Sequence, residues 1–303
     1  MKRGFLAFLP GLLVLAACAC GGPATRAARP APGAGPPPSG TVGNDGGKVN
    51  RLFFATTGDT RPASCDASDQ YPRETIAQLA AAMKGLRVQF ALDLGDHMFV
   101  CNGSRDEARQ QMGFYMTAIA AGPPTWWMTM GNHECGSAYR GTGCAVGTPD
   151  ANFEAYLAAL RRPRPWYATS VQTDLGLARI VVVADDAWGD EQAAWLETTL
   201  ADADAHARVT IVARHHPATG SRTGNASALA TIERHKYTLL LTAHSHTYER
   251  DSERSVMVGL GGAPSIRAPG FGTVLENPDG SLSFVLHDLS GNPVGEPWSV
   301  AAQ

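Results

Sequence analysis

The chain has 303 residues, of which 44% are hydrophobic, and its formal net charge at pH 7 is −3. This mild acidity argues against nucleic-acid binding, which would need a basic patch. The length leaves room for one large domain after a short N-terminal region.

The N-terminus has the pattern of an export signal. Lys2 and Arg3 precede a short apolar stretch that ends in Leu15-Ala16-Ala17-Cys18. The stretch is short for a membrane span, and its last four residues resemble a bacterial lipobox. We therefore expect residues 1–17 to be a lipoprotein signal peptide and Cys18 to be acylated. The exported protein would then be lipid-anchored to the cell membrane on its extracytoplasmic side. The alternative is ordinary cleavage and free secretion.

Residues 18–49 have the composition of a tether. Prolines at positions 23, 30, 32 and 36–38 are interspersed with many glycines and alanines. Such a segment cannot bury a core and is expected to be partly extended. We therefore expect the folded domain to comprise residues 50–303.

The first half of this domain is predicted to alternate strands and helices. Apolar strands are expected at 51–56, 88–94 and 125–130, and helices at 72–84 and 106–120. This alternation is typical of an α/β fold with parallel strands.

Potential metal ligands follow these three strands. Gly58-Asp59, Gly95-Asp96 and Gly131-Asn132-His133-Glu134 supply carboxylates, an amide and an imidazole. Open parallel sheets hold their active sites in the loops at the carboxyl ends of the strands. A single Gly-Asp is usually only a turn, but three such strings in this order indicate a common site.

The second half of the domain is richer in strands. Strands are predicted over 178–186, 208–217, 237–246, 255–262, 271–277 and 282–288, and a helix over 189–200. The last two strands are joined by Pro278-Asp279-Gly280, which is typical of a β-hairpin. Two sheets packed face to face and covered by helices would accommodate this order.

Histidines end two of these strands. His215 lies at the end of the strand at 208–217, and His244 and His246 lie at the end of the strand at 237–246. Because side chains at i and i+2 of an extended segment share a face, His244 and His246 are expected to converge on one spot, which suits metal binding. Taken alone, the pair is equally well explained as two surface histidines in a loop.

Four cysteines lie in the predicted domain, namely Cys65, Cys101, Cys135 and Cys144. Export permits disulfides, and four cysteines allow three pairings. Cys135 and Cys144 share a glycine-rich loop, whereas Cys65 and Cys101 each follow a short acidic motif at a strand end. We therefore predict the pairs Cys65–Cys101 and Cys135–Cys144. A zinc site of four thiolates is the alternative, but the chain has no Cys-x-x-Cys pair.

Together these motifs resemble the calcineurin-like metallophosphoesterase superfamily. The resemblance rests on Gly58-Asp59, Gly95-Asp96, Gly131-Asn132-His133-Glu134, His215-His216-Pro217 and Ala243-His244-Ser245-His246. Thr247-Tyr248-Glu249-Arg250 and the stretches at 190–200 and 270–294 are similar to purple acid phosphatases and their bacterial relatives. The similarity spans residues 51–298 and implies a four-layer α/β/β/α sandwich of two mixed sheets with a two-metal centre.

The resemblance also implies roles for single residues. The first metal would be bound by Asp59, Asp96 and His246, and the second by Asp96, Asn132, His215 and His244. Asp96 would thus bridge two ions such as iron, zinc or manganese, which lower the pKa of a shared water and make it a nucleophilic hydroxide. His133 would lie beside the substrate phosphate and stabilise charge or protonate the leaving oxygen. His216 is expected behind the ligands or facing the phosphate.

Two positions depart from these relatives. Arg61 stands where members with an Asp-x-His motif have a histidine ligand, and Phe99 stands where purple acid phosphatases have a tyrosine. We therefore expect a weaker first metal site and no tyrosinate-to-iron colour. Arg61 could contact the substrate phosphate through its planar guanidinium, or it could simply pair with an acid such as Asp66. Tyr71 and His97 are near in sequence, but no pattern assigns either to the metal.

The expected function is metal-dependent hydrolysis of small phosphate esters, most readily phosphomonoesters. One alternative is a phosphodiesterase that acts on nucleotides or phospholipid headgroups. Another is a non-catalytic surface binding protein whose first metal site has decayed. Metal content and turnover of a generic phosphate ester would separate these interpretations.

Overall fold

The computed structural model describes residues 35–136, 144, 150–219 and 224–302. The predicted signal peptide and Cys18 lie outside these residues. The fold below is that of the compact unit Pro32–Gln303, within the described residues. None of the helices in the described ranges combines the length and apolarity that a membrane span requires.

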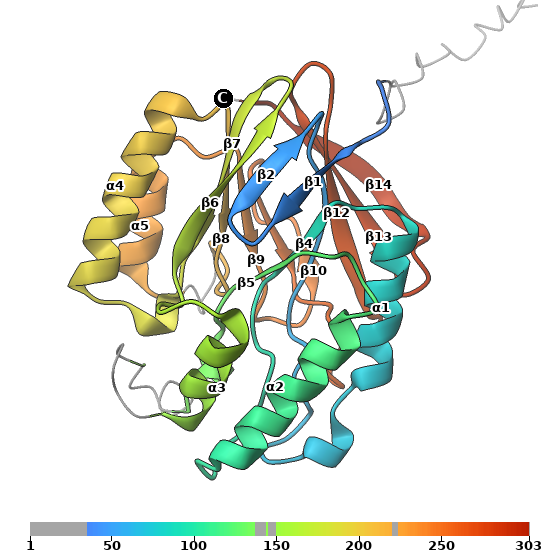
Figure 1. Cartoon of the computed structure of the whole chain (residues 1–303), viewed down its shortest axis with the longest axis vertical. Helices are drawn as coiled ribbons and strands as arrows, with labels where there is room; N and C mark the ends of the chain where they lie inside the picture. The colour runs from blue at the N-terminus through green and yellow to red at the C-terminus, as the bar shows by residue number, and fades with distance from the viewer. Residues whose placement is uncertain (1–34, 137–143, 145–149, 220–223, 303) are drawn as a thin grey trace, which may run out of the picture. The chain divides into compact units, whose positions relative to one another are not determined.

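Two β-sheets form the centre of the described part of the chain (Figure 1). The first has the strand order β1 (Gly40–Gly43), β2 (Gly46–Val49), β6 (Tyr167–Thr173), β7 (Gly176–Val182), β8 (Val209–Ala213), β9 (Leu239–Thr242), β11 (Ser255–Val258), β10 (Tyr248–Glu249). The second has the order β14 (Pro293–Val300), β13 (Leu282–Asp288), β12 (Gly270–Glu276), β3 (Phe53–Thr57), β4 (Phe90–Asp93), β5 (Trp126–Met128). Both sheets contain parallel and antiparallel pairs, so both are mixed.

Helices and short 3-10 turns connect the strands. The helices are α1 (Arg73–Gly85), α2 (Arg105–Ile119), α3 (Ala151–Leu160), α4 (Asp190–His206) and α5 (Ala226–Arg234), and the turns are Ser68–Gln70, Asn132–Glu134 and Asp185–Ala187. Side chains cap three of the helices: Ser104 accepts a backbone N–H at the start of α2, Asp150 does so for α3 and Asn225 for α5. Such N-caps satisfy donors that the helix itself leaves free.

Successive side chains of the second sheet pack alternately against the first sheet and against a helix. Phe54 of β3 is buried in the large cluster between the sheets. Ala55, its neighbour, faces the other way and packs with Leu79 and Met83 of α1. The period of two in the strand thus buries one face against the other sheet and the opposite face against a helix.

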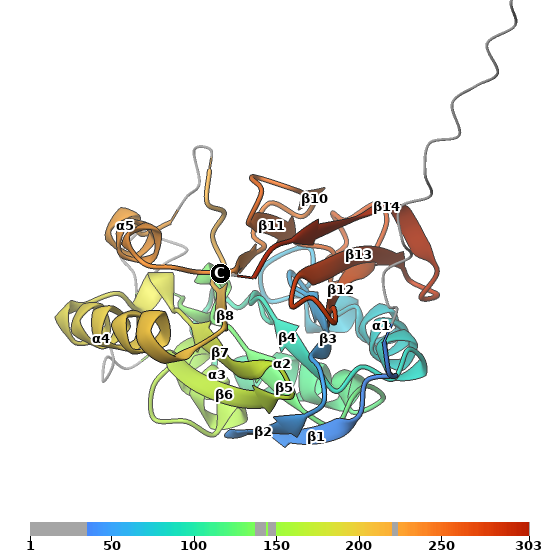
Figure 2. The ribbon, with the colours of Figure 1, turned by 90° about the horizontal axis from the view of Figure 1, so that it is seen from above.

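The first sheet repeats this arrangement on its own side. Ile180 lies in the cluster between the sheets, whereas Val181 packs with Leu196 and Leu200 of α4. Figure 2 shows α4 and α5 on one side of the sheets and α1 on the other. The predicted four-layer α/β/β/α sandwich is confirmed.

Residues 40–49 are not part of a tether, which corrects the predicted boundary at residue 50. They form the antiparallel pair β1–β2, and β2 joins β6 in parallel, with Lys48 opposite Gln172. The segment has few apolar residues because it lies at the sheet edge, where Val42 and Val49 supply the buried side chains. Gly40 and Gly46 have positive φ, so glycines that resemble a flexible linker in composition instead permit the hairpin.

Both predicted disulfides are present, Cys65–Cys101 and Cys135–Cys144. All four cysteines of the domain are therefore paired, and the alternative of a four-thiolate zinc site is wrong. The first disulfide joins the loop after β3 to the loop after β4, both of which carry residues of the predicted site.

Candidate metal centre

The predicted ligands come together in the loops that follow β3, β4, β5, β8 and β9. Two groups of these predicted ligands could each hold a cation. The first group is Asp59, Asp96 and His246, and the second is Asp96, His215 and His244; within each group the ligand atoms lie within 4.8 Å of one another. Asn132 joins the second group, because its Oδ1 lies 3.0 Å from His244 Nδ1. Asp96 belongs to both groups, which is the position a bridging carboxylate requires.

Hydrogen bonds fix which ring nitrogen faces the centre. His215 Nδ1 lies 2.7 Å from the carbonyl of Leu94, which can only accept, so Nδ1 carries the proton. Nε2 is therefore the ring nitrogen that faces the centre, 3.4 Å from Asp96 Oδ1. His246 Nδ1 contacts the Ser265 hydroxyl, which can donate or accept, and its Nε2 lies 3.5 Å from Asp59 Oδ1. Partners of this kind orient histidine ligands in metal sites.

Ser265 was not predicted from the sequence. It lies in a loop after β11, far from any motif. Only its contact with His246 assigns it to the site, so no sequence pattern could have found it.

Four of the ligands have left-handed backbones. The φ angles are 64° for Asp59, 63° for Asp96, 74° for His244 and 54° for His246. Such conformations cost on the order of 1–3 kcal/mol each and are concentrated at functional sites. The left-handed turns at these residues direct side chains from successive loops toward the same centre.

These angles correct the explanation for the His-x-His pair. β9 ends at Thr242, so His244 and His246 are not successive residues on one face of a strand. They belong to different groups, His244 to the second and His246 to the first. The prediction that both histidines reach the centre holds, but the extended geometry behind it is wrong.

Two glycines allow loops to approach the carboxylates closely. A Cβ at Gly131 would collide with the Asp96 carboxylate, and one at Gly259 would collide with that of Asp59. Glycine is therefore required at both positions for the ligands to keep their places.

Burial and neighbouring charges shift the pKa values of three side chains at the centre. Burial raises the pKa of Asp59 to about 7, with His215 opposing this effect. Burial lowers the pKa of His215, but the nearby Asp96 carboxylate more than offsets this and raises it to about 10. Burial together with Arg61 lowers the pKa of His246 to about 4. A cation that neutralises the two buried carboxylates would displace the protons held by Asp59 and His215.

Glu134 ties the loop after β4 to the loop after β5. Its buried carboxylate accepts the backbone N–H groups of Gly131 at 2.6 Å, Asp96 at 2.9 Å and His97 at 2.6 Å. The His97 ring lies behind Asp96, where its Nε2 is 2.6 Å from Asp93 and its Nδ1 is 3.3 Å from Glu134. Burial lowers the pKa of His97, but the two carboxylates raise it to about 10.

His97 belongs to none of the candidate metal groups among the described residues, and the Tyr71 hydroxyl is engaged elsewhere. His97 is enclosed by the two carboxylates, and the Tyr71 hydroxyl donates to the His97 carbonyl at 2.5 Å. These two side chains therefore do not replace the ligand that the first group lacks.

A cavity of about 450 Å³ opens over the two groups. It is lined by Arg61, Asp96, Asn132, His133, His244, Ser245, His246 and Ser265. His133 is buried, its backbone N–H donates to Asp96 Oδ1 at 3.0 Å, and its Nε2 lies 3.7 Å from Asp96 Oδ2. Burial lowers the pKa of His133, while Asp96 opposes that shift. The cavity therefore offers an imidazole beside the carboxylate that the two groups share.

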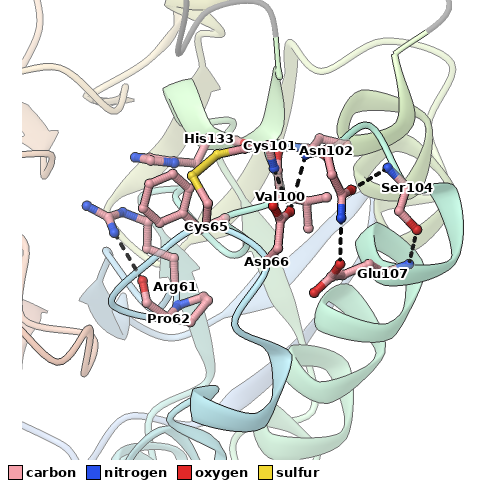
Figure 3. The surroundings of a disulfide bond; sticks show 12 residues. Arg61, Pro62, Cys65, Asp66, Val100, Cys101, Asn102, Ser104, Glu107 and His133 are labelled. Carbon is pink, nitrogen blue, oxygen red and sulfur yellow. Dashed lines mark hydrogen bonds between the residues drawn. A yellow bond between two sulfur atoms is a disulfide. The ribbon is translucent and has the colours of Figure 1, made fainter.

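Arg61 turns toward the centre rather than toward Asp66. Its Nε lies 3.5 Å from Asp96 Oδ2, and its Nη2 lies 3.5 Å from His246 Nε2. Asp66 Oδ1 instead accepts the backbone N–H of Cys101 at 2.8 Å (Figure 3). The structure thus disfavours the alternative of a simple Arg61–Asp66 pair.

His216 lies behind the second group. Its ring centroid is 4.5 Å from that of His244, and its Nε2 is 2.9 Å from Asp186 Oδ2. The neighbouring Asp185 forms a buried ion pair with Arg214 at 2.9 Å. These contacts agree with the expectation that His216 supports the ligands or faces the phosphate.

A sequence model of the calcineurin-like phosphoesterases matches residues 54–248, which is more than half of the chain. The chain belongs to this family. Family membership and the two ligand groups support metal-dependent hydrolysis of phosphate esters by this calcineurin-like phosphoesterase. No curated protein matches the chain.

Solved structures share the fold at low sequence identity. The purple acid phosphatase PPD1 from yellow lupin (Lupinus luteus) seeds is 16% identical with a TM-score of 0.58, over 85% of this chain and 54% of that chain. GAP50, the anchor in the inner membrane complex of Plasmodium, is 14% identical with a TM-score of 0.58, over 84% and 89%. A dimetal phosphatase from Danio rerio is 13% identical with a TM-score of 0.54, over 83% and 99%. The chain spans about half the length of the lupin protein.

Proposed function

We propose that this chain hydrolyses phosphomonoesters with a two-metal centre. The observation that carries the proposal is the shared carboxylate of Asp96, which lies within ligand distance of both groups. The first metal would be held by Asp59, Asp96 and His246, and the second by Asp96, Asn132, His215 and His244. Bound cations would supply water activation and charge neutralisation at phosphorus.

Two further residues would act on the substrate. His133 lines the cavity beside Asp96 and would stabilise the transition state or donate a proton to the leaving oxygen. Arg61 lines the same cavity and would donate to a phosphate oxygen through its guanidinium. A permanent cation and an imidazole next to two metals suit the dianionic group of a monoester, which supports this class over diesters.

A substrate panel tests the proposal. The purified chain, loaded with manganese, zinc or iron, is assayed against p-nitrophenyl phosphate and bis(p-nitrophenyl) phosphate, with His133→Ala alongside. We expect the monoester to react at least about tenfold faster than the diester and His133→Ala to slow it by about a hundredfold. Faster turnover of the diester would favour a phosphodiesterase. Bound metals without any turnover would favour a non-catalytic binding protein.

We also propose that the protein is exported and anchored by a lipid on Cys18, which the Leu15-Ala16-Ala17-Cys18 sequence supports. We expect the wild-type protein to fractionate with membranes and Cys18→Ser to release it or block its processing. Mass spectrometry of the N-terminus and cell fractionation would measure both effects. A wild-type protein that is wholly soluble in the medium and unmodified at its N-terminus would contradict this proposal.

The iron-loaded protein is expected to lack tyrosinate-to-iron colour. Phe99 has no ring oxygen, and the Tyr71 hydroxyl is bonded to the His97 carbonyl. The visible absorption spectrum after loading with ferric iron measures this directly. An intense charge-transfer band would show that another oxygen ligand reaches the metal.

A further inference from the structure

We infer that Arg61 makes the two metal groups unequal: the second group holds its cation at rest, whereas the first fills together with a phosphate anion. This inference rests on the proposed function and adds to it the order in which the centre assembles.

The two groups differ in their ligands. The second brings four ligand atoms together, with His244 Nδ1 3.0 Å from Asn132 Oδ1 and 3.1 Å from His215 Nε2, and with His215 Nε2 3.4 Å from Asp96 Oδ1. Among the described His, Cys, Asp and Glu residues, the first group offers three ligands, Asp59, Asp96 and His246. Fewer ligands give the first cation less binding energy, and Asp96 must serve both cations.

Arg61 adds a charge to the weaker group. Its guanidinium contacts two of the three ligands of that group, Asp96 at 3.5 Å and His246 at 3.5 Å. Arginine stays protonated in proteins, so a fixed positive charge stands next to the atoms that would bind the first metal. Like charges a few ångströms apart repel strongly at the low dielectric constant of a protein interior. Arg61 therefore neutralises part of the negative charge of the carboxylates. It also opposes the binding of a cation in the first group.

The guanidinium is held in this position from several sides. Its Nη1 donates to the Pro62 carbonyl at 3.0 Å, and its central carbon lies 4.7 Å from the centre of the Phe99 ring. Phe99 in turn is fixed by its backbone N–H, which donates to Gln111 Oε1 at 2.8 Å. The Cys65–Cys101 disulfide joins the two loops that carry Arg61 and Phe99, and Figure 3 shows it beside the Arg61–Pro62 contact. Swinging the guanidinium away from the first group would break these contacts.

A phosphate group would remove the repulsion. Arg61 lines the cavity together with His133, and its planar fork of N–H donors suits phosphate oxygens. A bound phosphate brings negative charge between the guanidinium and the first cation. The two ligands then favour each other's binding, and this coupling is reciprocal. Phosphate should strengthen first-group metal binding by the same factor by which the first metal strengthens phosphate binding.

Manganese titration of the metal-free full chain by calorimetry tests the inference without any activity measurement. In the wild type we expect one tight binding event and a second that is about a hundredfold weaker. Inorganic phosphate at a saturating concentration should strengthen the second event at least about tenfold. His246→Ala should remove the weak event and leave the tight one, which identifies the weak event with the first group.

Substitutions at Arg61 show whether its charge or the smaller number of ligands makes metal binding in the first group weak. Arg61→Met removes the charge, and we expect it to strengthen the weak event about tenfold or more and to abolish its dependence on phosphate. Arg61→Lys keeps a charge and should leave the event weak. Arg105→Met is the matched control, because Arg105 pairs with Glu154 at the surface, and it should change neither event.

Other results would overturn the inference. Two equally tight events in the wild type without phosphate, or an Arg61→Met titration identical to wild type, would do so while leaving the two-metal phosphatase intact. A chain that binds no manganese at all would instead overturn the proposed function, and the inference with it.

Discussion

Asp96→Ala is expected to abolish phosphate ester hydrolysis and to remove both metal ions, whereas Asp59→Ala should leave the second metal bound. Asp96 lies within ligand distance of both groups, while Asp59 contributes only to the first. Losing the bridge removes a stabilisation of several kcal/mol at the reacting phosphorus, so the rate should fall by roughly a thousandfold or more. The Asp59 variant should keep measurably more activity.

Metal analysis and steady-state kinetics on the two variants measure this difference. Asp69→Ala is a suitable control, since Asp69 is exposed on the short turn Ser68–Gln70, and it should retain wild-type rates and metal content. Equal residual rates in the two variants, with both metals retained in Asp96→Ala, would refute the bridging assignment.

Glu134→Gln is expected to destabilise the domain by about 3 kcal/mol. The carboxylate accepts three backbone N–H groups and faces the charged His97 ring. His97 lowers the pKa of Glu134 against the opposing effect of burial, so the carboxylate is ionised. A glutamine loses this charge, and its NH2 group would face donors instead of accepting from them.

Denaturant unfolding gives the free energy of the variant, and a metal titration shows whether the Asp96 loop has moved. Glu154→Gln changes an exposed carboxylate that pairs with Arg105 at 3.0 Å, and its effect should stay below about 1 kcal/mol. If Glu134→Gln were as stable as this control and bound metal normally, Glu134 would not hold the two loops together.

The candidate ligands that follow β3, β4 and β5 could be predicted from the sequence because these three strands are parallel neighbours in one sheet. Parallel strands end at the same edge of a sheet, so a polar residue after each apolar run is directed to one region. Asp59, Asp96 and Asn132 needed no knowledge of side-chain packing to be grouped. The disulfides could be predicted from loop positions: Cys65–Cys101 joins the loops that follow β3 and β4, and Cys135 and Cys144 lie only nine residues apart in one loop.

The rest of the site depends on contacts that sequence spacing does not encode. The left-handed backbones of His244 and His246 place the two neighbouring histidines in different candidate groups. Ser265 reaches His246 from a loop with no motif of its own. Loop geometry likewise decides the partner of Arg61: Asp66 was plausible by charge alone, but the acid that Arg61 contacts is Asp96, at 3.5 Å.

The hairpin of β1 and β2 affects how a shortened version of this protein would behave. A recombinant fragment that starts at residue 50 would lack β2, and the β6 strand Tyr167–Thr173 would lose its parallel neighbour. Its backbone N–H and C=O groups would then form an open sheet edge, which is a template for aggregation. Fragments that begin before Gly40 keep this edge covered and should stay monodisperse at higher concentration.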